Sequence, residues 1–306
     1  MQPDGNGAKE FPMKIGFLGL GRMGSAMATR LLGAGYELAV FDLVEPATAR
    51  MAAAGATVRA SIRDLAAASD VVISMLPDDE ALRAATLGPQ GLVGALAPGA
   101  IHVISGTHGV QVIDEIASAH RAAGQVLVTC HVLGRPDLAA SGKLGLVPAG
   151  PAAAVQSLRG VFAVLGERIF EAGEDPLSAT AMKVANNYVL GCAIEAIGEG
   201  MALVRKYGVD PQVFFRVLVE GLFDCTAYRA YADIIAKMDW GRIGATAVIG
   251  LKDAVLSRQA ADKVHITLPS LGAWQTHLEH AIARGEAQLD WSVMAREQFR
   301  ESGLEE

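Results

Sequence analysis

The stretch IGFLGLGRMG at residues 15–24 runs from a short apolar segment directly into a glycine-rich motif. The apolar segment predicts a buried strand over 14–18, and the residues after the motif predict a helix over 23–32. In this context the glycines of G-x-G-x-x-G permit a tight turn, approach of a pyrophosphate and close helix–strand packing. The N-terminus of the predicted helix also favours phosphate binding, because it offers free backbone N–H groups and the positive end of the helix dipole. We therefore expect a dinucleotide-binding turn made of Gly19, Leu20, Gly21, Arg22, Met23 and Gly24.

The acidic residue after the next apolar segment indicates which nucleotide the turn accepts. Asp42 follows a strand predicted over Glu37–Phe41, where a carboxylate accepts hydrogen bonds from the ribose hydroxyls of NAD. It would repel a 2′-phosphate, and Leu43 and Val44 stand where an NADP site would place an arginine. Arg50 lies further along a predicted helix. We therefore expect NAD in preference to NADP, the alternative being a structural turn followed by a surface aspartate.

Working outward from this turn, strands and helices alternate through the first half of the chain. The strands are almost continuously apolar, which is typical of a parallel sheet covered by helices on both faces. This predicts an α/β fold with a Rossmann-type doubly wound parallel sheet. The predicted strands are Lys14–Leu18, Glu37–Phe41, Thr57–Val58, Val71–Met75, Ile101–Ile104 and Val126–Thr129, with Leu144–Pro148 and Arg168–Glu171 as extensions.

The second half predicts helices only. Asp175-Pro176 is a typical helix start, and only isolated glycines interrupt the helical pattern before Gly208. One helix of about 45 Å is therefore expected over 176–206. Shorter helices are predicted after 210–211 and over 226–237, 248–261 and 268–284. The predicted domains are a flexible extension at 1–12, a Rossmann domain at 13–175 and an all-α domain at 176–306 that includes the interdomain helix 176–206.

The composition restricts the partners and the compartment. Hydrophobic residues make up 51% and charged residues 19% of the chain, which predicts a sizeable core. The net charge of −7 without a run of basic residues argues against nucleic acid and anionic membranes, and no transmembrane helix is expected. Cys130, Cys192 and Cys225 are widely spaced, which fits reduced thiols in the cytoplasm. The His277/His280 pair is interpreted as part of a surface helix, so no metal is expected.

Polar residues interrupt the apolar pattern of the long helix in TAMKVANNYVLGC at residues 180–192. Lys183 and Asn187 are four residues apart and therefore share one helix face, with Asn186 beside them. Such groups are costly to bury without partners. A cluster confined to one or two turns indicates a ligand, whereas a solvated face would be longer.

With this cluster the chain resembles the β-hydroxyacid dehydrogenases, the family that includes 3-hydroxyisobutyrate dehydrogenase and carries a nucleotide-binding domain of the 6-phosphogluconate dehydrogenase type. The resemblance rests on GLGRMG, SMLPDDEAL, GKLGLVPAG, KVANN, GLKDAVL and GEAQLDWS and spans residues 13–294. It implies a Rossmann domain, a long interdomain helix and an all-α domain. It also implies a homodimer or homotetramer that transfers hydride reversibly between NAD(P) and a β-hydroxy acid.

The resemblance also implies residue roles. Lys183 matches the catalytic lysine of the family, and Asn187 matches the asparagine that helps to hold the substrate. This suits the chemistry, because oxidation of an alcohol removes a hydride from carbon and a proton from oxygen, and a lysine with a pKa near the working pH accepts that proton. The other cofactor contacts implied by the resemblance are Leu76, Pro77, Thr107 and Lys252.

Two loops depart from the family pattern. Where the family has D-x-P-V-S-G-G, residues 129–135 read TCHVLGR. Substrate contacts are expected from His131, Gly134 and Arg135, because a guanidinium can grip a carboxylate with two hydrogen bonds. A solvated arginine and a structural histidine are the alternatives. In the second loop, Gly106 stands where the family has serine, and the role of His108 is open.

Three functions follow in order of preference. The first is an NAD-dependent dehydrogenase for a small β-hydroxy acid or its semialdehyde. The second is an imine reductase, a class of similar layout that usually lacks the lysine matched by Lys183. The third is a non-catalytic NAD-binding sensor or scaffold, which the intact pair of Lys183 and Asn187 disfavours. The substrate, its stereochemistry and the direction of reaction stay open at this point.

Overall fold

The computed structural model describes residues 13–304 and divides the chain into two compact units. The first unit ends at Lys183 and the second begins at Val184, so the division falls inside the long helix α9 (Pro176–Lys206). The predicted extension at residues 1–12 lies outside the described residues. Each unit has its own hydrophobic core.

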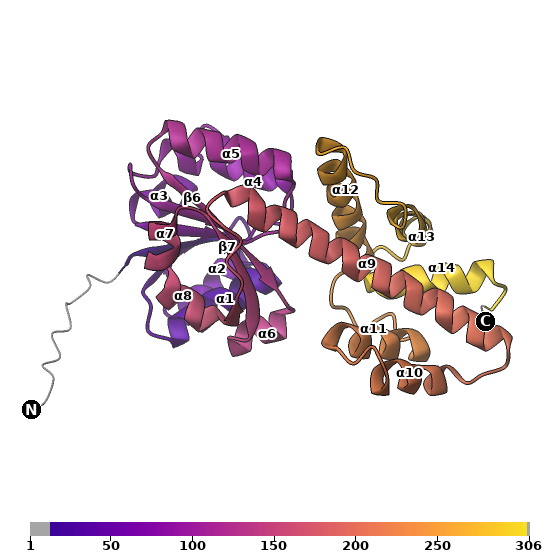
Figure 1. Cartoon of the computed structure of the whole chain (residues 1–306). Helices are drawn as coiled ribbons and strands as arrows, with labels where there is room; N and C mark the ends of the chain where they lie inside the picture. The colour runs from indigo at the N-terminus through magenta and orange to yellow at the C-terminus, as the bar shows by residue number, and fades with distance from the viewer. Residues whose placement is uncertain (1–12, 305–306) are drawn as a thin grey trace, which may run out of the picture. The chain divides into compact units, whose positions relative to one another are not determined.

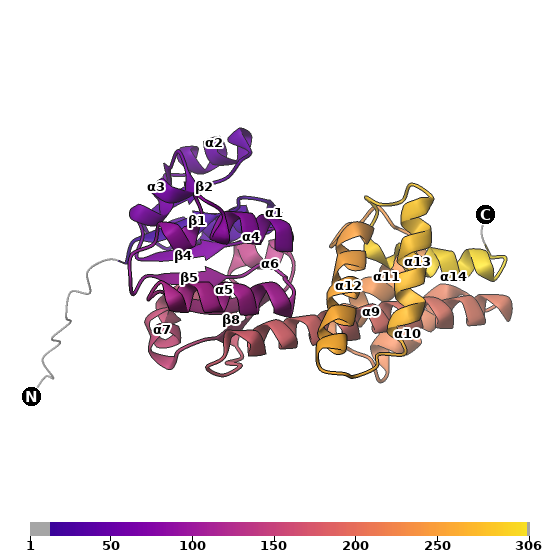
Figure 2. The same ribbon diagram turned by 90° about the horizontal axis from the view of Figure 1, so that it is seen from above.

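A single eight-stranded sheet, in the order β3-β2-β1-β4-β5-β6-β7-β8, forms the centre of the first unit. Neighbouring strands are parallel except for β6 and β7, which confirms the predicted Rossmann-type fold. Figure 2 shows β2, β1, β4 and β5 following one another. The chain order reverses between β1 and β4, and open sheets bind ligands beyond the carboxyl ends of their strands at such a point. The strands are Ile15–Leu18, Leu38–Phe41, Thr57–Val58, Val71–Ser74, Ile101–Ile104, Val126–Leu133, Leu144–Ala149 and Gly166–Ile169.

Helices cover both faces of the sheet because successive side chains of a strand point to opposite faces. Ile15 and Phe17 pack into the core that includes α1 and α8, whereas Leu18 packs into the core that includes α3. In Figure 1, α4 and α5 lie on one side of the sheet and α1 and α8 on the other. Burial of each large side chain contributes about 2 kcal/mol. The helices α1 to α8 are Arg22–Gly33, Glu45–Ala53, Ile62–Ala67, Asp79–Leu87, Val110–Ala122, Pro136–Ser141, Ala152–Ser157 and Arg159–Leu165.

The sixth strand is longer than predicted. The pattern predicted a strand over 126–129 followed by a substrate loop, but β6 continues to Leu133. The strand pairs antiparallel with β7 from Thr129 opposite Ala149 to Leu133 opposite Gly145, so all four extra residues are paired. Strand pairing with a distant segment, which the local pattern does not reveal, therefore places most of the predicted loop inside the sheet.

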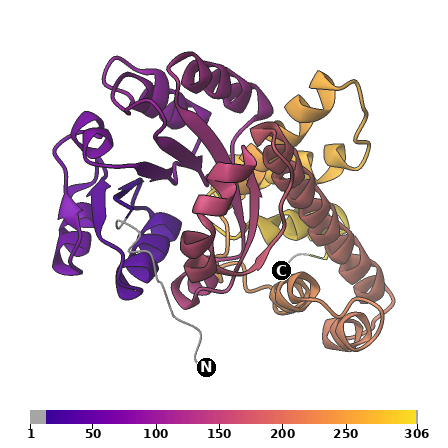
Figure 3. The ribbon, with the colours of Figure 1, turned by 60° about the vertical axis from the view of Figure 1, so that its left-hand side comes forward.

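The second unit contains helices only, as predicted. Helix α9 begins in the first unit, where Asp175, just ahead of Pro176, accepts a hydrogen bond from the backbone N–H of Leu177 at 2.9 Å. Trp274 and Trp291 lie at the centre of the core, and Gly191 and Gly250 admit their rings because a Cβ at either glycine would lie 2.8 Å from an indole carbon. Figure 3 shows α10 and α11 beside the C-terminal half of α9. The helices α10 to α14 are Pro211–Glu220, Thr226–Lys237, Ala247–Lys263, Leu271–Ala283 and Met294–Glu301.

The interpretation of the His277/His280 pair as part of a surface helix holds for His280, which is exposed, but not for His277, which is buried. His277 lies on α13 with 7% of its surface exposed, and its Nδ1 is 2.7 Å from Oε1 of Glu195 on α9. The Glu195 carboxylate, as an acceptor, raises the pKa of His277 above its usual value, whereas burial raises the pKa of Glu195 itself. This pair links α9 to α13, and the helical periodicity of α13 did not reveal it because the partner lies on another helix.

Helix α9 is also the one described helix that is long and apolar enough to cross a membrane by length and composition alone. In its most apolar 18-residue window, 44% of the residues are buried inside the protein. The core helix of a soluble protein passes the same test, so this property is weak evidence for a membrane span.

Candidate active site

The glycine-rich turn between β1 and α1 has the geometry of a phosphate cradle. Gly19 has a φ of +93°, and a Cβ there would collide with the carbonyl oxygen of Met75. A Cβ on Gly24 would collide with the carbonyl oxygen of Gly19. A Cβ on Gly21, by contrast, would meet no atom within 4 Å. The first and third glycines are therefore required by the fold, and the second faces open space that a pyrophosphate can fill.

Asp42 at the end of β2 closes one side of this turn. Its Oδ2 accepts a hydrogen bond from the backbone N–H of Leu20 at 2.5 Å, and its Oδ1 accepts one from Val44 at 2.8 Å. A hollow of about 380 Å³ lies beside it. The glycine-rich turn and Asp42 line this hollow, and two arginines contribute to its wall. Its lining consists of Leu20, Gly21, Arg22, Ser25, Asp42, Val44, Ala47 and Arg50.

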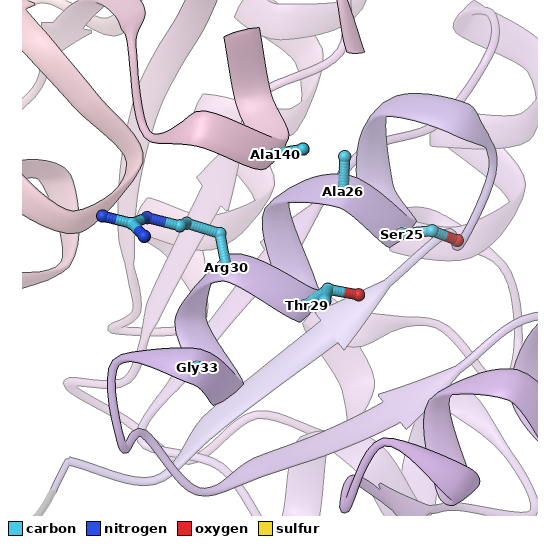
Figure 4. Close-up of a pocket in the computed structure, with 6 residues that line it drawn as sticks. All are labelled: Ser25, Ala26, Thr29, Arg30, Gly33 and Ala140. Atoms are coloured by element: carbon cyan, nitrogen blue, oxygen red, sulfur yellow. The ribbon is translucent and has the colours of Figure 1, made fainter. Parts of the chain in front are cut away.

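A second hollow, of about 450 Å³, lies over the outer face of α1 (Figure 4). Five of its six lining residues come from α1 and one, Ala140, comes from α6. Arg30, whose side chain points away from Ser25 and Thr29 in Figure 4, donates a hydrogen bond from Nε to the carbonyl oxygen of Val164 at 3.2 Å. None of the predicted site residues lines this hollow, so it is not a candidate for the reaction centre.

The predicted cofactor residues Leu76, Pro77 and Thr107 lie in the loops that follow β4 and β5. Asp79, the first residue of α4, joins these loops because its carboxylate accepts hydrogen bonds from the backbone N–H of Gly109 at 3.0 and 3.3 Å. Its Oδ1 is also 3.2 Å from Nδ1 of His108. Sequence reasoning missed Asp79, although it belongs to the quoted SMLPDDEAL stretch.

Lys183 reaches from α9 to the strand β6. Its Nζ donates a hydrogen bond to the carbonyl oxygen of Val132 at 2.9 Å. The neighbouring His131 is fully buried, and its Nε2 lies 2.9 Å from Oγ1 of Thr180, one turn earlier on α9. The histidine therefore ties β6 to the first turns of α9, and its predicted contact with substrate stays a prediction.

Gly134 and Arg135 lie where β6 passes into α6. Gly134 has a φ of +139°, which favours glycine, and a Cβ there would stand 3.0 Å from Leu144. Arg135 occupies the N-cap position of α6. Its side chain is 40% exposed, and its Nε is 3.8 Å from Oδ1 of Asp137. Arg135 is thus accessible to a ligand, as its predicted role requires.

In the second unit, Asp253 contacts the remaining two predicted site residues, Asn187 and Lys252. Asn187 donates from Nδ2 to Oδ2 of Asp253 at 2.7 Å and accepts at Oδ1 from Asn186 at 3.2 Å. The ammonium of Lys252 lies 3.5 Å from Oδ1 of Asp253. Asp253 is 6% exposed and was missed, although it stands inside the GLKDAVL motif. It fixes the orientation of the Asn187 amide because a carboxylate only accepts hydrogen bonds.

Behind the cofactor loops lies a buried chain of hydrogen bonds. Ser74 Oγ is 2.8 Å from Nε2 of His102, whose Nδ1 is 2.9 Å from Nε2 of His120, whose Nδ1 is 2.7 Å from Oε1 of Gln125. The Gln125 amide donates to two backbone carbonyls, so its Oε1 accepts from Nδ1 of His120. When both histidines are neutral, each therefore carries its hydrogen on Nδ1. Burial lowers the pKa of both histidines, that of His102 well below its usual value.

These contacts support a redox reaction on a nicotinamide nucleotide. The turn, Asp42 and the loops after β4 and β5 offer a surface for the nucleotide at the switch point of the sheet. Lys183 offers an amine for proton transfer. Over residues 13–304, no group of three or more histidine, cysteine, aspartate or glutamate side chains is arranged to hold a metal ion.

Comparison with known proteins matches both parts of the chain. Residues 14–173 match the NAD binding domain of 6-phosphogluconate dehydrogenase, and residues 178–297 match the model described as NAD-binding of NADP-dependent 3-hydroxyisobutyrate dehydrogenase. An uncharacterized oxidoreductase of Bacillus subtilis is 35% identical over 284 residues, which cover 93% of this chain and 99% of that protein. The NAD-dependent L-serine dehydrogenase of Pseudomonas aeruginosa is 33% identical over 291 residues, with 92% and 97% covered.

A solved structure extends the similarity to three dimensions. The 3-hydroxyisobutyrate dehydrogenase of Mycobacterium tuberculosis, determined with L-serine, has a TM-score of 0.85 and 27% identity to this chain. The match covers 94% of this chain and 99% of that one.

Proposed function

The chain belongs to the β-hydroxyacid dehydrogenase family, and from this premise we propose that it interconverts a small β-hydroxy acid and its semialdehyde with NAD as the preferred cofactor. The family makes it an NAD(P)-dependent oxidoreductase acting on CH–OH groups. The observation that carries the finer proposal is the position of Lys183, which the bond to Val132 O holds at the end of β6 near Gly134.

Proton transfer is assigned to Lys183. A bound NAD would supply the hydride acceptor for this reaction. Lys183 in its neutral form then takes the hydroxyl proton, and in its charged form it returns that proton during reduction. The bond to Val132 O fixes the direction of the flexible lysine side chain. Asn187, one helical turn further along α9, is assigned to substrate binding, since an amide donates and accepts hydrogen bonds without titrating.

The preference for NAD is supported by Asp42. Both of its carboxylate oxygens accept backbone hydrogen bonds, so the carboxylate is held beside the glycine-rich turn. Its charge there favours ribose hydroxyls and disfavours a 2′-phosphate. Arg22 and Arg50 line the same hollow, and their positive charges would attract a 2′-phosphate. We therefore expect NAD to be preferred over NADP, but NADP not to be excluded. Arg50 lies closer to the nucleotide site than its place in the sequence suggested.

Arg135 supports a substrate with a carboxylate. Leu133, which replaces the family serine, has no polar side-chain atom, and an exposed guanidinium two residues later supplies two parallel donors. L-Serine is itself a β-hydroxy acid. The L-serine dehydrogenase and the enzyme solved with L-serine therefore make L-serine a rational first substrate, together with 3-hydroxyisobutyrate.

The test follows nicotinamide absorbance with NAD and NADP against β-hydroxy acids, their semialdehydes and cyclic imines. We expect turnover of at least one β-hydroxy acid, with a higher kcat/KM for NAD than for NADP. Turnover of imines alone would favour the imine reductase alternative. Tight NADH binding without turnover on any of these compounds would favour the sensor or scaffold.

A further inference from the structure

Asp79 and His108 connect the two loops that follow β4 and β5, residues 75–78 and 105–109. His108 is 1% exposed, and its Nδ1 lies 3.2 Å from Oδ1 of Asp79. Because a carboxylate only accepts hydrogen bonds, Nδ1 carries the hydrogen. The same carboxylate accepts the backbone N–H of Gly109. One carboxylate from the start of α4 thus holds both the side chain and the backbone of the loop after β5.

Gly106 lies directly against the imidazole of His108. A Cβ on Gly106 would collide with Nε2 of His108 and would stand 2.6 Å from the carbonyl oxygen of Leu76. The imidazole of His108 therefore occupies the space that a side chain at position 106 would need. The backbone at Gly106 packs between this imidazole and the carbonyl oxygen of Leu76 in the other loop. This gives a physical reason for the departure from the family pattern, since a serine at position 106 is incompatible with this position of His108.

Both loops lie on the β4 side of the switch point, at the carboxyl ends of their strands. A dinucleotide that places its pyrophosphate on the turn after β1 extends its second nucleotide over this side of the sheet. Thr107, which the resemblance assigns to a cofactor contact, is next to His108 in the chain. The carbonyl oxygen of Leu76, a second residue assigned to the cofactor, lies against Gly106.

We propose that Asp79 and His108 are positioning residues for the nicotinamide half of the cofactor, which keep the loops 75–78 and 105–109 in their binding conformation before the cofactor arrives. This inference rests on the proposed function, since it takes a nicotinamide dinucleotide as the ligand. A loop that is already ordered loses less conformational freedom on binding. Loss of the pair therefore weakens cofactor binding more than it slows the chemical step.

The experiment measures NADH binding by isothermal titration calorimetry, independently of turnover. We expect Asp79→Ala and His108→Ala each to raise the Kd for NADH at least about fivefold, with kcat at saturating cofactor within about twofold of the unmodified protein. Glu80→Ala, an exposed carboxylate in the same helical turn, is the matched control and should leave the Kd unchanged. The double variant should bind no more weakly than the weaker single variant, because the two residues act as a unit.

His108→Asn provides the conservative variant, because its amide keeps an N–H donor close to the position of Nδ1. It should recover most of the NADH affinity that is lost in His108→Ala. If His108→Ala does not fold, the Kd of His108→Asn for NADH is compared with that of Asp79→Ala instead. Folded variants that bind NADH as tightly as the unmodified protein would overturn the inference and leave the proposed function intact. Absence of NADH binding by the unmodified protein would overturn the proposed function itself.

Discussion

Asn187 and Asp253, which are 66 residues apart in the chain, are joined in the second unit by a hydrogen bond of 2.7 Å from the Asn187 amide to the aspartate carboxylate. The same carboxylate is 3.5 Å from the ammonium of Lys252. A single buried acid therefore orients one residue assigned to the substrate and one assigned to the cofactor. Its role is to position these groups.

Replacement of Asp253 should therefore disturb substrate binding. In Asp253→Ala the Asn187 amide loses its acceptor and the ammonium of Lys252 loses its counter-ion. We expect kcat/KM for the β-hydroxy acid to fall about 100-fold, a loss of about 3 kcal/mol that is typical for removal of a buried hydrogen-bonded charge. Steady-state kinetics with Asp262→Ala, an exposed aspartate on the same helix, provide the control. Equal kinetics for the two variants would contradict the role of Asp253.

Removal of the lysine amine should abolish most of the proton transfer. For Lys183→Ala we expect kcat to fall by about 10²–10⁴, the range for loss of a general acid–base group, while the Kd for NADH stays within about twofold. Lys206→Ala, an exposed lysine at the end of the same helix, should be indistinguishable from the unmodified protein. A variant at position 183 that keeps normal turnover would remove the lysine from the mechanism.

Cofactor discrimination should depend on the charge of Asp42. Asp42→Asn keeps one oxygen that can accept the backbone N–H of Leu20, gives up the acceptor for the N–H of Val44, and loses the charge that repels a 2′-phosphate. We expect the ratio of kcat/KM for NAD to that for NADP to fall about tenfold, because Arg22 and Arg50 remain beside the ribose site. Glu45→Gln, which removes an exposed carboxylate at the start of α2, controls for net charge. An unchanged ratio would mean that another residue sets the preference.

The buried histidine chain should make the protein sensitive to acid. Burial lowers the pKa of His102 and His120, so below about pH 6.5 the unfolded chain binds protons that the folded protein does not. The stability contributed by the neutral histidines is complete above that pH and is lost as the pH falls toward the lowered pKa values. We expect the Tm, measured from pH 8 to pH 5, to fall below pH 6.5.

The double variant His102→Leu/His120→Leu tests the origin of that loss. It should be less stable at pH 8, because Ser74 and Gln125 lose their partners, and its Tm should decline less steeply toward pH 5. An equally steep decline in the double variant would assign the acid sensitivity to other groups.

Much of the fold was predictable because its signals are local. The continuous apolar strands, the G-x-G-x-x-G turn and the Asp175-Pro176 helix start each depend on residues close together in the chain, and β5 and α9 have the predicted bounds. The extension of β6 to Leu133 was not predictable in this way. It depends on pairing with β7, and that pairing is antiparallel.

The sequence by itself determined the residue types that the family chemistry requires: the three glycines of the turn, Asp42, and the KVANN motif that carries Lys183 and Asn187. Tertiary structure alone decided the partners of these groups. Lys183 meets a backbone carbonyl of β6, Asn187 meets Asp253, and His108 meets Asp79. The physical reason is that periodicity and turn chemistry act over a few residues, whereas a buried polar group takes the partner that the packing of distant elements brings within hydrogen-bond distance.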